Sequence, residues 1–463
     1  MNVEQLYTNC LAEAAYYIES DGEAAIIDPI RETEPYISKL KSTGAKLKYV
    51  FETHFHADFV SGHIDLAKQT GAQIIFGPLA ETNYKVHNAK DGEFFSLGKL
   101  KIKVLHTPGH TPESSCYLLF DESGKEHCIF TGDTLFIGDV GRPDLLDGKM
   151  TSAEMASMLF DSLNNKIKTL PDDIVVYPAH GAGSACGKNI SKETFSTLGQ
   201  QKKTNYALQE MTRDDFIKVV TDGLSAPPQY FFKDAMINKT GYDNINEVLK
   251  RNMKPLSFEE VKKEIADGAL VLDTRIPDVF EKGFIKDSIN IGLNGQYAVW
   301  IGTLIDINRP LVFVTEDGKE LESILRAARV GYENVKGFLK GGMKAWMDSG
   351  NHVDSIQSIQ AKEFSSRIKS GKENILDVRK LSEYETAHVK NAELFELASL
   401  MNNIKNLSPD KTYLVHCAGG YRSMIACSIL KASGMNNIVN ISGGFGQIKT
   451  TSVPIEVSAE TSA

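Results

Sequence analysis

Four runs of apolar residues in the first 180 positions each stop close to polar side chains that can bind a metal ion. Short runs of apolar, β-branched and aromatic residues bounded by turn residues are typical of buried strands. The residues after these runs are His54, His56, Asp58, His110, Asp133 and His180. The pattern predicts strands that end along one edge of a sheet, where these six side chains converge.

The first 29 residues predict two strands around the turn Ser20-Asp21-Gly22. They lack the basic start and the uninterrupted apolar core of a secretory signal. We find no apolar run of membrane-spanning length in the sequence. A chain without membrane attachment is therefore expected.

The second half of the chain contains an internal repeat. Residues 271–291 parallel residues 375–395, and residues 311–342 align without a gap with residues 413–444 at an offset of 102. Each copy alternates short β runs with amphipathic helices, which predicts an independent doubly wound α/β domain. The predicted domains are 1–245, 255–352 and 356–455.

A metal ion is the simplest explanation for the polar residues of the first domain. A single histidine after a strand is more often a structural hydrogen-bonding residue than a ligand. Four such segments at one sheet edge reverse that preference, because only a metal compensates for gathering so many desolvated polar groups. Pro108-Gly109 and Gly132 are turn formers beside His110 and Asp133, as expected where a strand stops to present a ligand.

The second copy of the repeat contains a candidate nucleophile, Cys417. The loop Cys417-Ala418-Gly419-Gly420-Tyr421-Arg422-Ser423 lies between an apolar strand and a helical stretch. Backbone N–H groups, a helix N-terminus and the charge of Arg422 all favour the thiolate. Phosphatase loops of this kind have five residues between Cys and Arg. Four residues lie between them here, and this tighter ring favours sulfur transfer over dephosphorylation.

The other cysteines have weaker signals. Cys10, Cys116, Cys128 and Cys427 lie in apolar or helical segments without a basic neighbourhood, so we expect small buried side chains. Cys186 follows His180 by six residues in the glycine-rich GAGSACGK. It is a candidate to line the metal pocket and carry a persulfide, and an inert loop cysteine is an equal alternative. The six cysteines fit neither a disulfide framework nor a C-x-x-C site, which favours a reducing cytoplasm.

The first copy of the repeat has lost the nucleophile. At the offset of 102 residues, Thr315 replaces Cys417 and Glu320 replaces Arg422. The loop is acidic and would repel an anion. We interpret this copy as a structural spacer or docking module, with a binding role outside sulfur chemistry as the alternative.

The motifs quoted above resemble those of known families. The stretch His54-Phe55-His56-Ala57-Asp58-Phe59, with His110, Asp133 and His180, resembles the metallo-β-lactamase superfamily, whose motif is H-x-H-x-D-H. THFHADF, TPGHTPES, FTGDTLFIGDVGRPDLL, YPAHGAGSACG and LSAPPQYF resemble the persulfide dioxygenases of that superfamily. Both copies of the repeat resemble rhodanese domains. The resemblance implies an α/β protein with an αββα sandwich followed by two doubly wound domains.

The resemblance also implies the metal. His54, His110 and Asp133 would hold one Fe(II) per chain, with zinc an alternative in purified protein. His56, Asp58 and His180 would orient ligands or water, and Arg142 would support the site as a further active-site residue. Phe59 stands where binuclear members have a histidine, which disfavours a two-zinc hydrolase. Gly181 is a second departure, because other members have an aspartate there.

The implied function is a persulfide dioxygenase that uses a low-molecular-weight thiol persulfide and O2, coupled to rhodanese sulfur transfer between sulfite and thiosulfate in sulfide detoxification. The alternatives are a hydroxyacylglutathione hydrolase or other thioester hydrolase, a sulfur carrier with a vestigial metal domain, and a scaffold. The sequence leaves the thiol open among glutathione, coenzyme A, bacillithiol and others. A net charge of −9 does not indicate a nucleic-acid partner, because such a partner requires a basic surface. We expect a homo-oligomer whose size the sequence does not give.

Overall fold

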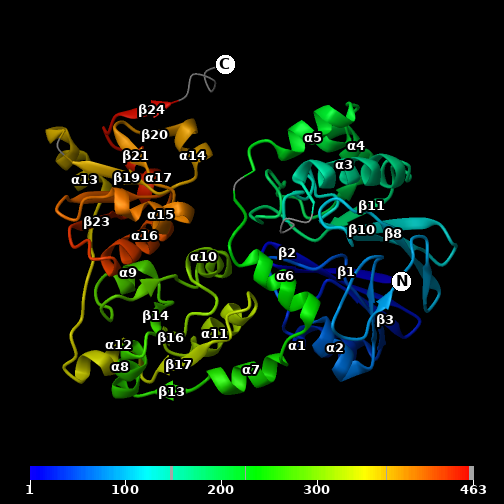
Figure 1. The fold of residues 1–463 in the computed structure, drawn as a ribbon, viewed down its shortest axis with the longest axis horizontal. Coiled ribbons are helices and arrows are strands. Elements are labelled where there is room, and N and C mark those ends of the chain that lie inside the picture. Colours follow the sequence, from blue (N-terminus) through cyan, green and yellow to red (C-terminus); the bar gives the residue numbers. More distant parts are fainter. Residues whose placement is uncertain (146–149, 225, 372, 458–463) are drawn as a thin grey trace. The chain divides into compact units, whose positions relative to one another are not determined.

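The computed structural model describes residues 1–145, 150–224, 226–371 and 373–457 (Figure 1). They form two compact units. The first unit contains Met1–Val248 together with Ala328–Gly331, and the second contains Leu249–Ala327 and the chain from Tyr332 onward. Within the described residues, no helix combines the length and the apolar character needed to cross a bilayer.

The described part of the first unit contains two six-stranded sheets. One sheet has the order β1 (Asn2–Thr8), β2 (Glu13–Ser20), β3 (Glu23–Ile27), β4 (Lys46–Phe51), β5 (Gln73–Phe76), β6 (His87–Asn88). The other has the order β12 (Ser196–Thr197), β11 (Val175–Pro178), β10 (Glu126–Gly132), β9 (Ser115–Phe120), β8 (Leu100–His106), β7 (Phe94–Leu97). The ends of β4, β8, β10 and β11 lie just before the predicted ligands.

At the N-terminus, the predicted turn at residues 20–22 is confirmed, but the structure also contains a strand and a turn that the sequence did not predict. Strands β2 and β3 form the expected hairpin, and Asp21 and Gly22 have φ values of 52° and 76° that suit its two-residue turn. The residues before the turn at 20–22 do not form one continuous strand. It contains β1, which ends at Thr8, and a turn closed by Leu11 N donating to Thr8 O at 3.1 Å.

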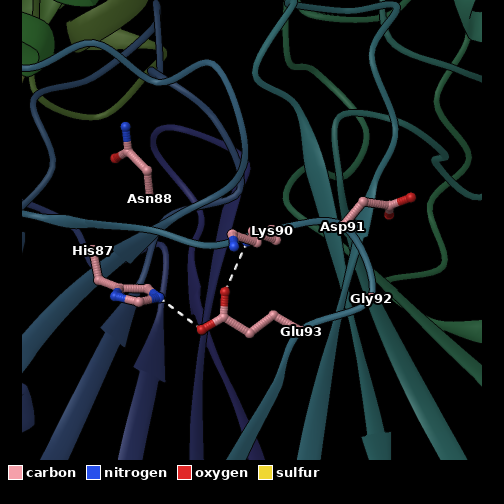
Figure 2. A pocket seen from close by; sticks show the side chains of 6 residues that line it. All are labelled: His87, Asn88, Lys90, Asp91, Gly92 and Glu93. Carbon is pink, nitrogen blue, oxygen red and sulfur yellow. Dashed lines mark hydrogen bonds and ion pairs between the residues drawn. The ribbon is translucent and has the colours of Figure 1, made fainter.

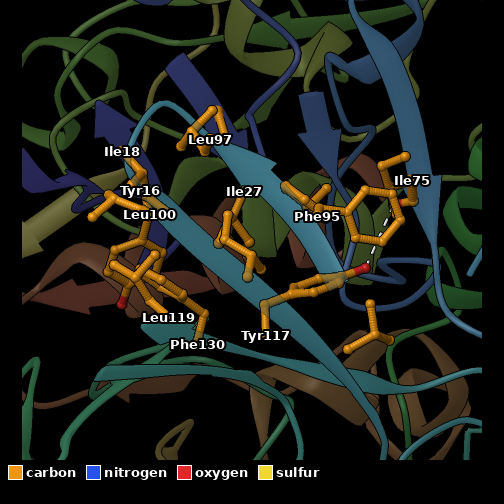
Figure 3. Packing of buried hydrophobic residues seen from close by; sticks show 14 of the residues in the cluster. Tyr16, Ile18, Ile27, Ile75, Phe95, Leu97, Leu100, Tyr117, Leu119 and Phe130 are labelled. Carbon is orange, nitrogen blue, oxygen red and sulfur yellow. Dashed lines mark hydrogen bonds between the residues drawn. The ribbon is translucent and has the colours of Figure 1, made fainter. Parts of the chain in front are cut away.

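The side chains of the two sheets interdigitate in a central apolar core (Figure 3). Tyr16 and Phe130 come from different sheets with ring centroids 4.9 Å apart, and Phe51 and Tyr117 are 4.7 Å apart. Along β9, Tyr117 faces this core whereas Cys116 faces the opposite side, as the period of two in a strand requires.

Helices cover the outer faces of the two sheets. The outer face of the second sheet packs with α3 (Ser152–Ser162), α4 (Leu198–Thr204) and α5 (Arg213–Thr221). On the first sheet, α2 (His63–Thr70) shares a cluster with β5, and α1 (Glu34–Thr43) connects β3 to β4. This arrangement confirms the expected αββα sandwich. The chain then continues through α6 (Phe231–Thr240) and α7 (Ile245–Asn252).

The two copies of the repeat have parallel sheets with matching strand order. The first is β13 (Pro255–Leu256), β17 (Val335–Leu339), β16 (Leu311–Val314), β14 (Leu270–Asp273), β15 (Ile289–Asn290). The second is β18 (Gln357–Ile359), β23 (Ile438–Ile441), β22 (Tyr413–His416), β19 (Asn374–Asp377), β21 (Ala392–Leu394). Strands β16 and β22 start 102 residues apart, so the repeat in the sequence is a repeat of the fold.

Short helices connect these strands in each copy. The first copy has α8 (Phe258–Ala266), α9 (Pro277–Phe280), α10 (Tyr297–Leu304), α11 (Glu320–Ala328) and α12 (Gly342–Asp348). The second has α13 (Ala361–Arg367), α14 (Leu381–Thr386), α15 (Leu400–Asn403), α16 (Tyr421–Ala432) and α17 (Gly444–Ile448), with a small pair of strands, β20 (Ala387–Val389) and β24 (Ile455–Val457). The strand-to-helix turn from β22 to α16 contains Cys417. The fold class predicted from the sequence is confirmed for all three domains.

Candidate metal centre and sulfur-transfer loop

The six predicted metal-type residues converge in the interior of the first unit. The ligand atoms of His54, His110 and Asp133 lie within 4.8 Å of one another, and the same holds for His56, Asp58 and His180. All six residues are buried. Four strand ends thus deliver them to one place, as the sequence pattern predicts.

The proton on His54 is fixed by its neighbours. Thr53 donates its hydroxyl hydrogen to Asp28 Oδ2 at 2.8 Å, so the hydroxyl oxygen is left to accept from His54 Nδ1 at 3.0 Å. With Nδ1 protonated, Nε2 of His54 has a free lone pair. A carboxylate–hydroxyl–imidazole chain of this kind is how proteins orient metal-binding histidines.

His110 and His180 present the same nitrogen for the same reason. Nδ1 of His110 donates to Arg142 O at 2.9 Å, and Nδ1 of His180 donates to Ala12 O at 3.3 Å, because a carbonyl can only accept. In the neutral form of either imidazole, Nε2 therefore presents its lone pair towards Asp133.

These nitrogens surround the carboxylate of Asp133. Its Oδ2 lies 3.3 Å from His110 Nε2 and 3.8 Å from His54 Nε2, and its Oδ1 lies 3.6 Å from His180 Nε2. Neither carboxylate oxygen has a hydrogen-bond partner within the described residues. A buried carboxylate facing imidazole lone pairs is costly unless a cation lies between them, so this donor set fits a metal ion.

The electrostatics of the site agree with this interpretation. Burial, reinforced by the neighbouring imidazoles of His56, His110 and His180, lowers the pKa of His54 well below its usual value. Burial also raises the pKa of Asp58. For His180, burial lowers the pKa, but the carboxylates of Asp58 and Asp133 outweigh it and the pKa is raised. The site thus favours neutral His54, and the carboxylates of Asp58 and Asp133 stabilise positive charge on His180.

Phe59 stands where binuclear members of the superfamily have a histidine, and its side chain has no atom that can bind a metal. Its ring is fully buried and stacks on the ring of His56 with centroids 4.4 Å apart. His56 Nε2 lies 3.1 Å from Asp28 Oδ1. At Gly181, the second departure from the family motif, a Cβ atom would lie 2.4 Å from Tyr7 Oη, so Tyr7 already fills that space.

The backbone of Arg142 forms hydrogen bonds with His110 and Cys186. Its carbonyl orients His110, and its N–H donates to Cys186 O at 2.9 Å. Its guanidinium forms two hydrogen bonds to Asp144, both at 2.7 Å. The structure therefore places Arg142 beside the ligands, with its charge paired to Asp144.

Cys186 lies next to the ligands. It is fully buried, and its Sγ belongs to a group with Asp133 and His180 whose ligand atoms are within 4.8 Å of one another. Burial, followed by the charges of Asp58 and Asp133, raises the pKa of its thiol well above the usual value. The structure thus places Cys186 beside Asp133 and His180, and both alternatives from the sequence stay predictions.

The remaining cysteines follow the prediction with one exception. Cys116, Cys128 and Cys427 are buried in β9, β10 and α16, and burial raises the pKa of Cys116 to about 11. The interpretation of Cys10 is wrong. It is partly exposed in the turn after β1, and its Sγ accepts a hydrogen bond from Arg329 at 3.1 Å within the first unit.

A shallow surface depression of the first unit is separate from these residues. It is lined by His87, Asn88, Lys90, Asp91, Gly92 and Glu93, and His87 Nε2 lies 2.7 Å from Glu93 Oε1 (Figure 2). None of the predicted site residues lines it.

In the second unit, the loop after β22 forms a cradle around Cys417. The N–H of Gly420 donates to Cys417 Sγ at 3.1 Å, and the Ser423 hydroxyl is 3.6 Å from the same sulfur. Gly420 has φ 105°, a conformation that favours glycine. Sulfur therefore faces a backbone donor at the start of α16.

Arg422 does not offer a free charge to this cradle. Its guanidinium forms a bidentate ion pair with Glu383 of α14, with distances of 2.6 and 2.8 Å. Burial would raise the pKa of Glu383, but the hydrogen bonds and charge of Arg422 lower it overall. The sequence prediction missed Glu383, because no local pattern connects it to a loop 39 residues away.

Two further buried carboxylates were also missed. Asp28 and Glu52 directly follow β3 and β4, and each lies within 3.8 Å of His56 Nε2. The signal that identified the other ligands, a polar residue after an apolar run, is present at both positions. Both belong to the layer of polar groups around the ligands.

The geometry agrees with the comparisons to known proteins. The sequence pattern of the Metallo-beta-lactamase superfamily matches residues 8–180, and that of the Rhodanese-like domain matches residues 257–349 and 360–451. The mitochondrial persulfide dioxygenase ETHE1 of Homo sapiens is 32% identical over 213 residues, which are 45% of this chain and 76% of that protein. A probable hydroxyacylglutathione hydrolase of Schizosaccharomyces pombe is 36% identical over 181 residues, 38% of this chain and 66% of that protein.

Among solved structures, a metallo-beta-lactamase from Staphylococcus aureus subsp. aureus COL has a TM-score of 0.65 and 31% identity, and the match covers 73% of this chain and 98% of that one. Fold, donor set and comparisons together define a metallo-beta-lactamase domain joined to two rhodanese-like domains, of which the first lacks the cysteine. Within that superfamily, the chain belongs to the persulfide dioxygenase family.

Proposed function

We propose that the first domain is a non-haem Fe(II) persulfide dioxygenase. The overall reaction is R–S–SH + O2 + H2O giving R–SH, sulfite and two protons. The S–S bond breaks, the terminal sulfur is oxidised, and O2 is reduced. The observation that carries the proposal is the unpartnered carboxylate of Asp133, which faces the free Nε2 atoms of His54 and His110 beside a phenylalanine at the second-metal position.

His54, His110 and Asp133 would hold the iron, a facial set of two imidazoles and one carboxylate. Iron bound there supplies Lewis acidity and electrons for O2 chemistry. Thr53 and the Arg142 carbonyl fix the orientation of the two imidazoles. This preorganisation would direct the Nε2 atoms of His54 and His110 towards the metal.

The surrounding residues handle protons and sulfur in this proposal. His56, Asp58 and His180 form a second group that can orient water or the substrate. Cys186, close to Asp133 and His180, is the candidate to carry a persulfide within the pocket. The alternative of an inert loop cysteine makes the opposite prediction, since Cys186→Ala would then leave the rate of O2 uptake unchanged.

The third domain is proposed to transfer sulfane sulfur through Cys417. The thiolate attacks the outer sulfur of thiosulfate and forms a cysteine persulfide while sulfite leaves. In the opposite direction, a Cys417 persulfide passes its sulfur to sulfite and gives thiosulfate. The Gly420 N–H at 3.1 Å from Cys417 Sγ supports the thiolate in either direction. The product of one domain would be a reactant for the other.

The proposed setting is sulfide detoxification in a reducing cytoplasm by a homo-oligomer, with a low-molecular-weight thiol as carrier. The six free cysteines are compatible with such a setting. Neither nucleic acid nor a membrane is a proposed partner.

A thioester hydrolase is the second candidate. It is favoured by the similarity to the hydroxyacylglutathione hydrolase and by the second donor group of His56, Asp58 and His180. Such an enzyme uses metal-activated water and needs no O2. Phe59 weakens this candidate because it removes a ligand of the second metal.

One comparison separates the two functions. The full chain, loaded with iron or with zinc, is assayed for O2 uptake with glutathione persulfide and for hydrolysis of S-lactoylglutathione. We expect O2 uptake with iron and negligible thioester hydrolysis with either metal. Hydrolysis by the zinc form without O2 uptake by the iron form would overturn the proposal in favour of the hydrolase.

A further inference from the structure

Tyr421, in the middle of the Cys417 loop, reaches into the first rhodanese-like copy. Its hydroxyl donates to Gly292 O at 2.7 Å. Its ring lies against Gly295, where an added Cβ atom would be 2.4 to 2.6 Å from three ring carbons. The loop at residues 291–296, called here the glycine socket, therefore receives the Tyr421 side chain.

Buried hydrogen bonds within the first copy shape this socket. Arg326 Nη1 donates to Leu293 O at 2.8 Å. The amide of Asn290 donates to the carbonyls of Asp273 and Arg275 at 3.0 and 2.9 Å. Because these partners belong to the first copy, its own hydrogen bonds support the shape that receives Tyr421.

The same helix has a second contact with the first copy. Asn290 N donates to Ser428 Oγ at 3.0 Å, and α16 packs against β15. Burial raises the pKa of Tyr421, so its hydroxyl stays protonated and remains a donor. The two contacts differ in one respect: Tyr421 belongs to the catalytic loop, whereas Ser428 lies seven residues further along α16.

Tyr421 directly follows Gly420, whose N–H contacts Cys417 Sγ at 3.1 Å. A displacement of Tyr421 would therefore move the donor that stabilises the thiolate. The first copy has Lys319 at the position equivalent to Tyr421, and its own loop has no cysteine. We propose that the first copy positions the catalytic loop of the second by holding Tyr421 in the glycine socket, with Tyr421 and Gly295 as positioning residues. This proposal rests on the sulfur-transfer role of Cys417.

The test compares the full chain with five variants. Gly295→Ala obstructs the socket, Tyr421→Phe removes only the hydroxyl, and Tyr421→Ala removes the ring. The double variant Gly295→Ala/Tyr421→Ala combines two of these changes, and Ser428→Ala is the control at the same interface. The first measurement is the pH profile of Cys417 alkylation by iodoacetamide, followed on its peptide by mass spectrometry. The second is kcat and KM for sulfur transfer from thiosulfate to a thiol. Alkylation needs no sulfur substrate, so it reports on the loop even in a chain without transferase activity.

We expect Gly295→Ala to shift the alkylation midpoint to higher pH and to lower kcat by about tenfold or more, since small misplacements of reacting groups are costly. Tyr421→Phe should lower kcat by about threefold, as for the loss of one hydrogen bond. Ser428→Ala should match the wild type in both measurements. Adding Gly295→Ala to Tyr421→Ala should have no further effect, because the ring that it obstructs is gone.

An unchanged alkylation profile in Gly295→Ala would overturn the positioning role. So would equal losses in Gly295→Ala and Ser428→Ala, because they would indicate a general weakening of the interface. Absence of sulfur transfer in the wild type, with the alkylation shift still present in Gly295→Ala, would refute the proposed function of Cys417 and leave the socket supported.

Discussion

Nε2 of His110 lies 3.3 Å from Oδ2 of Asp133, and both residues are buried. Because Nδ1 donates to the Arg142 carbonyl, a neutral His110 directs the lone pair of Nε2 at the carboxylate. A cation between these two electron-rich atoms would satisfy both of them. This relationship is the physical basis for the proposed iron site.

The first prediction concerns metal content. Iron-loaded protein should hold about one iron per chain, and His110→Ala should lose most of it together with about 100-fold or more of the O2 uptake. Metal analysis by mass spectrometry checks the content. His87→Ala is the matched control, because His87 pairs with Glu93 outside the site. Active enzyme with two tightly bound zinc ions per chain would contradict the prediction.

The second prediction separates the two activities. Cys417→Ser should abolish sulfur transfer from thiosulfate to a thiol and leave persulfide-dependent O2 uptake measurable, because the thiolate and the iron ligands belong to different domains. His110→Ala should show the reverse pattern. If Cys417→Ser reduced O2 uptake to the level of His110→Ala, the two sites would not be independent.

Much of the site follows from local sequence patterns. His110, Asp133 and His180 were predictable because each follows an apolar strand, and the loop of Cys417 because a strand and a helix flank it. The same rule would have found Asp28 and Glu52. The local sequence was sufficient in these cases, because residues that follow a strand lie at the edge of the sheet where that strand ends.

Other features depend on pairings between distant residues. Tyr421 and Gly292 are 129 positions apart, and Arg422 and Glu383 are 39 apart. Arg329 and Cys10 are separated by 319 positions, so the basic neighbour of Cys10 has no local signal. These contacts require the packing of whole elements, and a single sequence does not specify that packing.

The third prediction concerns the degenerate loop. Thr315→Ala should change neither persulfide oxidation nor sulfur transfer, because a threonine hydroxyl without an adjacent base is a poor nucleophile. Thr315→Cys alone should add little activity, since Glu320 would raise the thiol pKa and repel thiosulfate. Thr315→Cys with Glu320→Arg has a better environment, although Glu316 and Asp317 still oppose an anion.

Steady-state kinetics of both reactions check this prediction, with folding and iron content as controls. A loss of tenfold or more in Thr315→Ala, equivalent to roughly 1.4 kcal/mol of barrier, would show that this loop takes part in the chemistry.

The fourth prediction concerns the ion pair of Arg422 with Glu383. Glu383→Gln removes one negative charge beside the loop and leaves a polar side chain of the same size, so Arg422 can attract thiosulfate more strongly. We expect KM for thiosulfate to fall roughly two- to fivefold at low ionic strength, the range set by partly exposed ion pairs. The difference should shrink at high salt. A rise in KM would mean that the pair orients Arg422 more than it neutralises it.

The ratio of sulfite formed to O2 consumed measures the proposed dioxygenase reaction itself. Iron-loaded wild type and His110→Ala are supplied with the persulfides of glutathione, coenzyme A and bacillithiol in turn, with an O2 electrode and sulfite quantification. The proposed reaction requires persulfide-dependent uptake for at least one carrier, with one sulfite for each O2 and near-complete loss in His110→Ala. No O2 uptake above the His110→Ala level with any persulfide would contradict it.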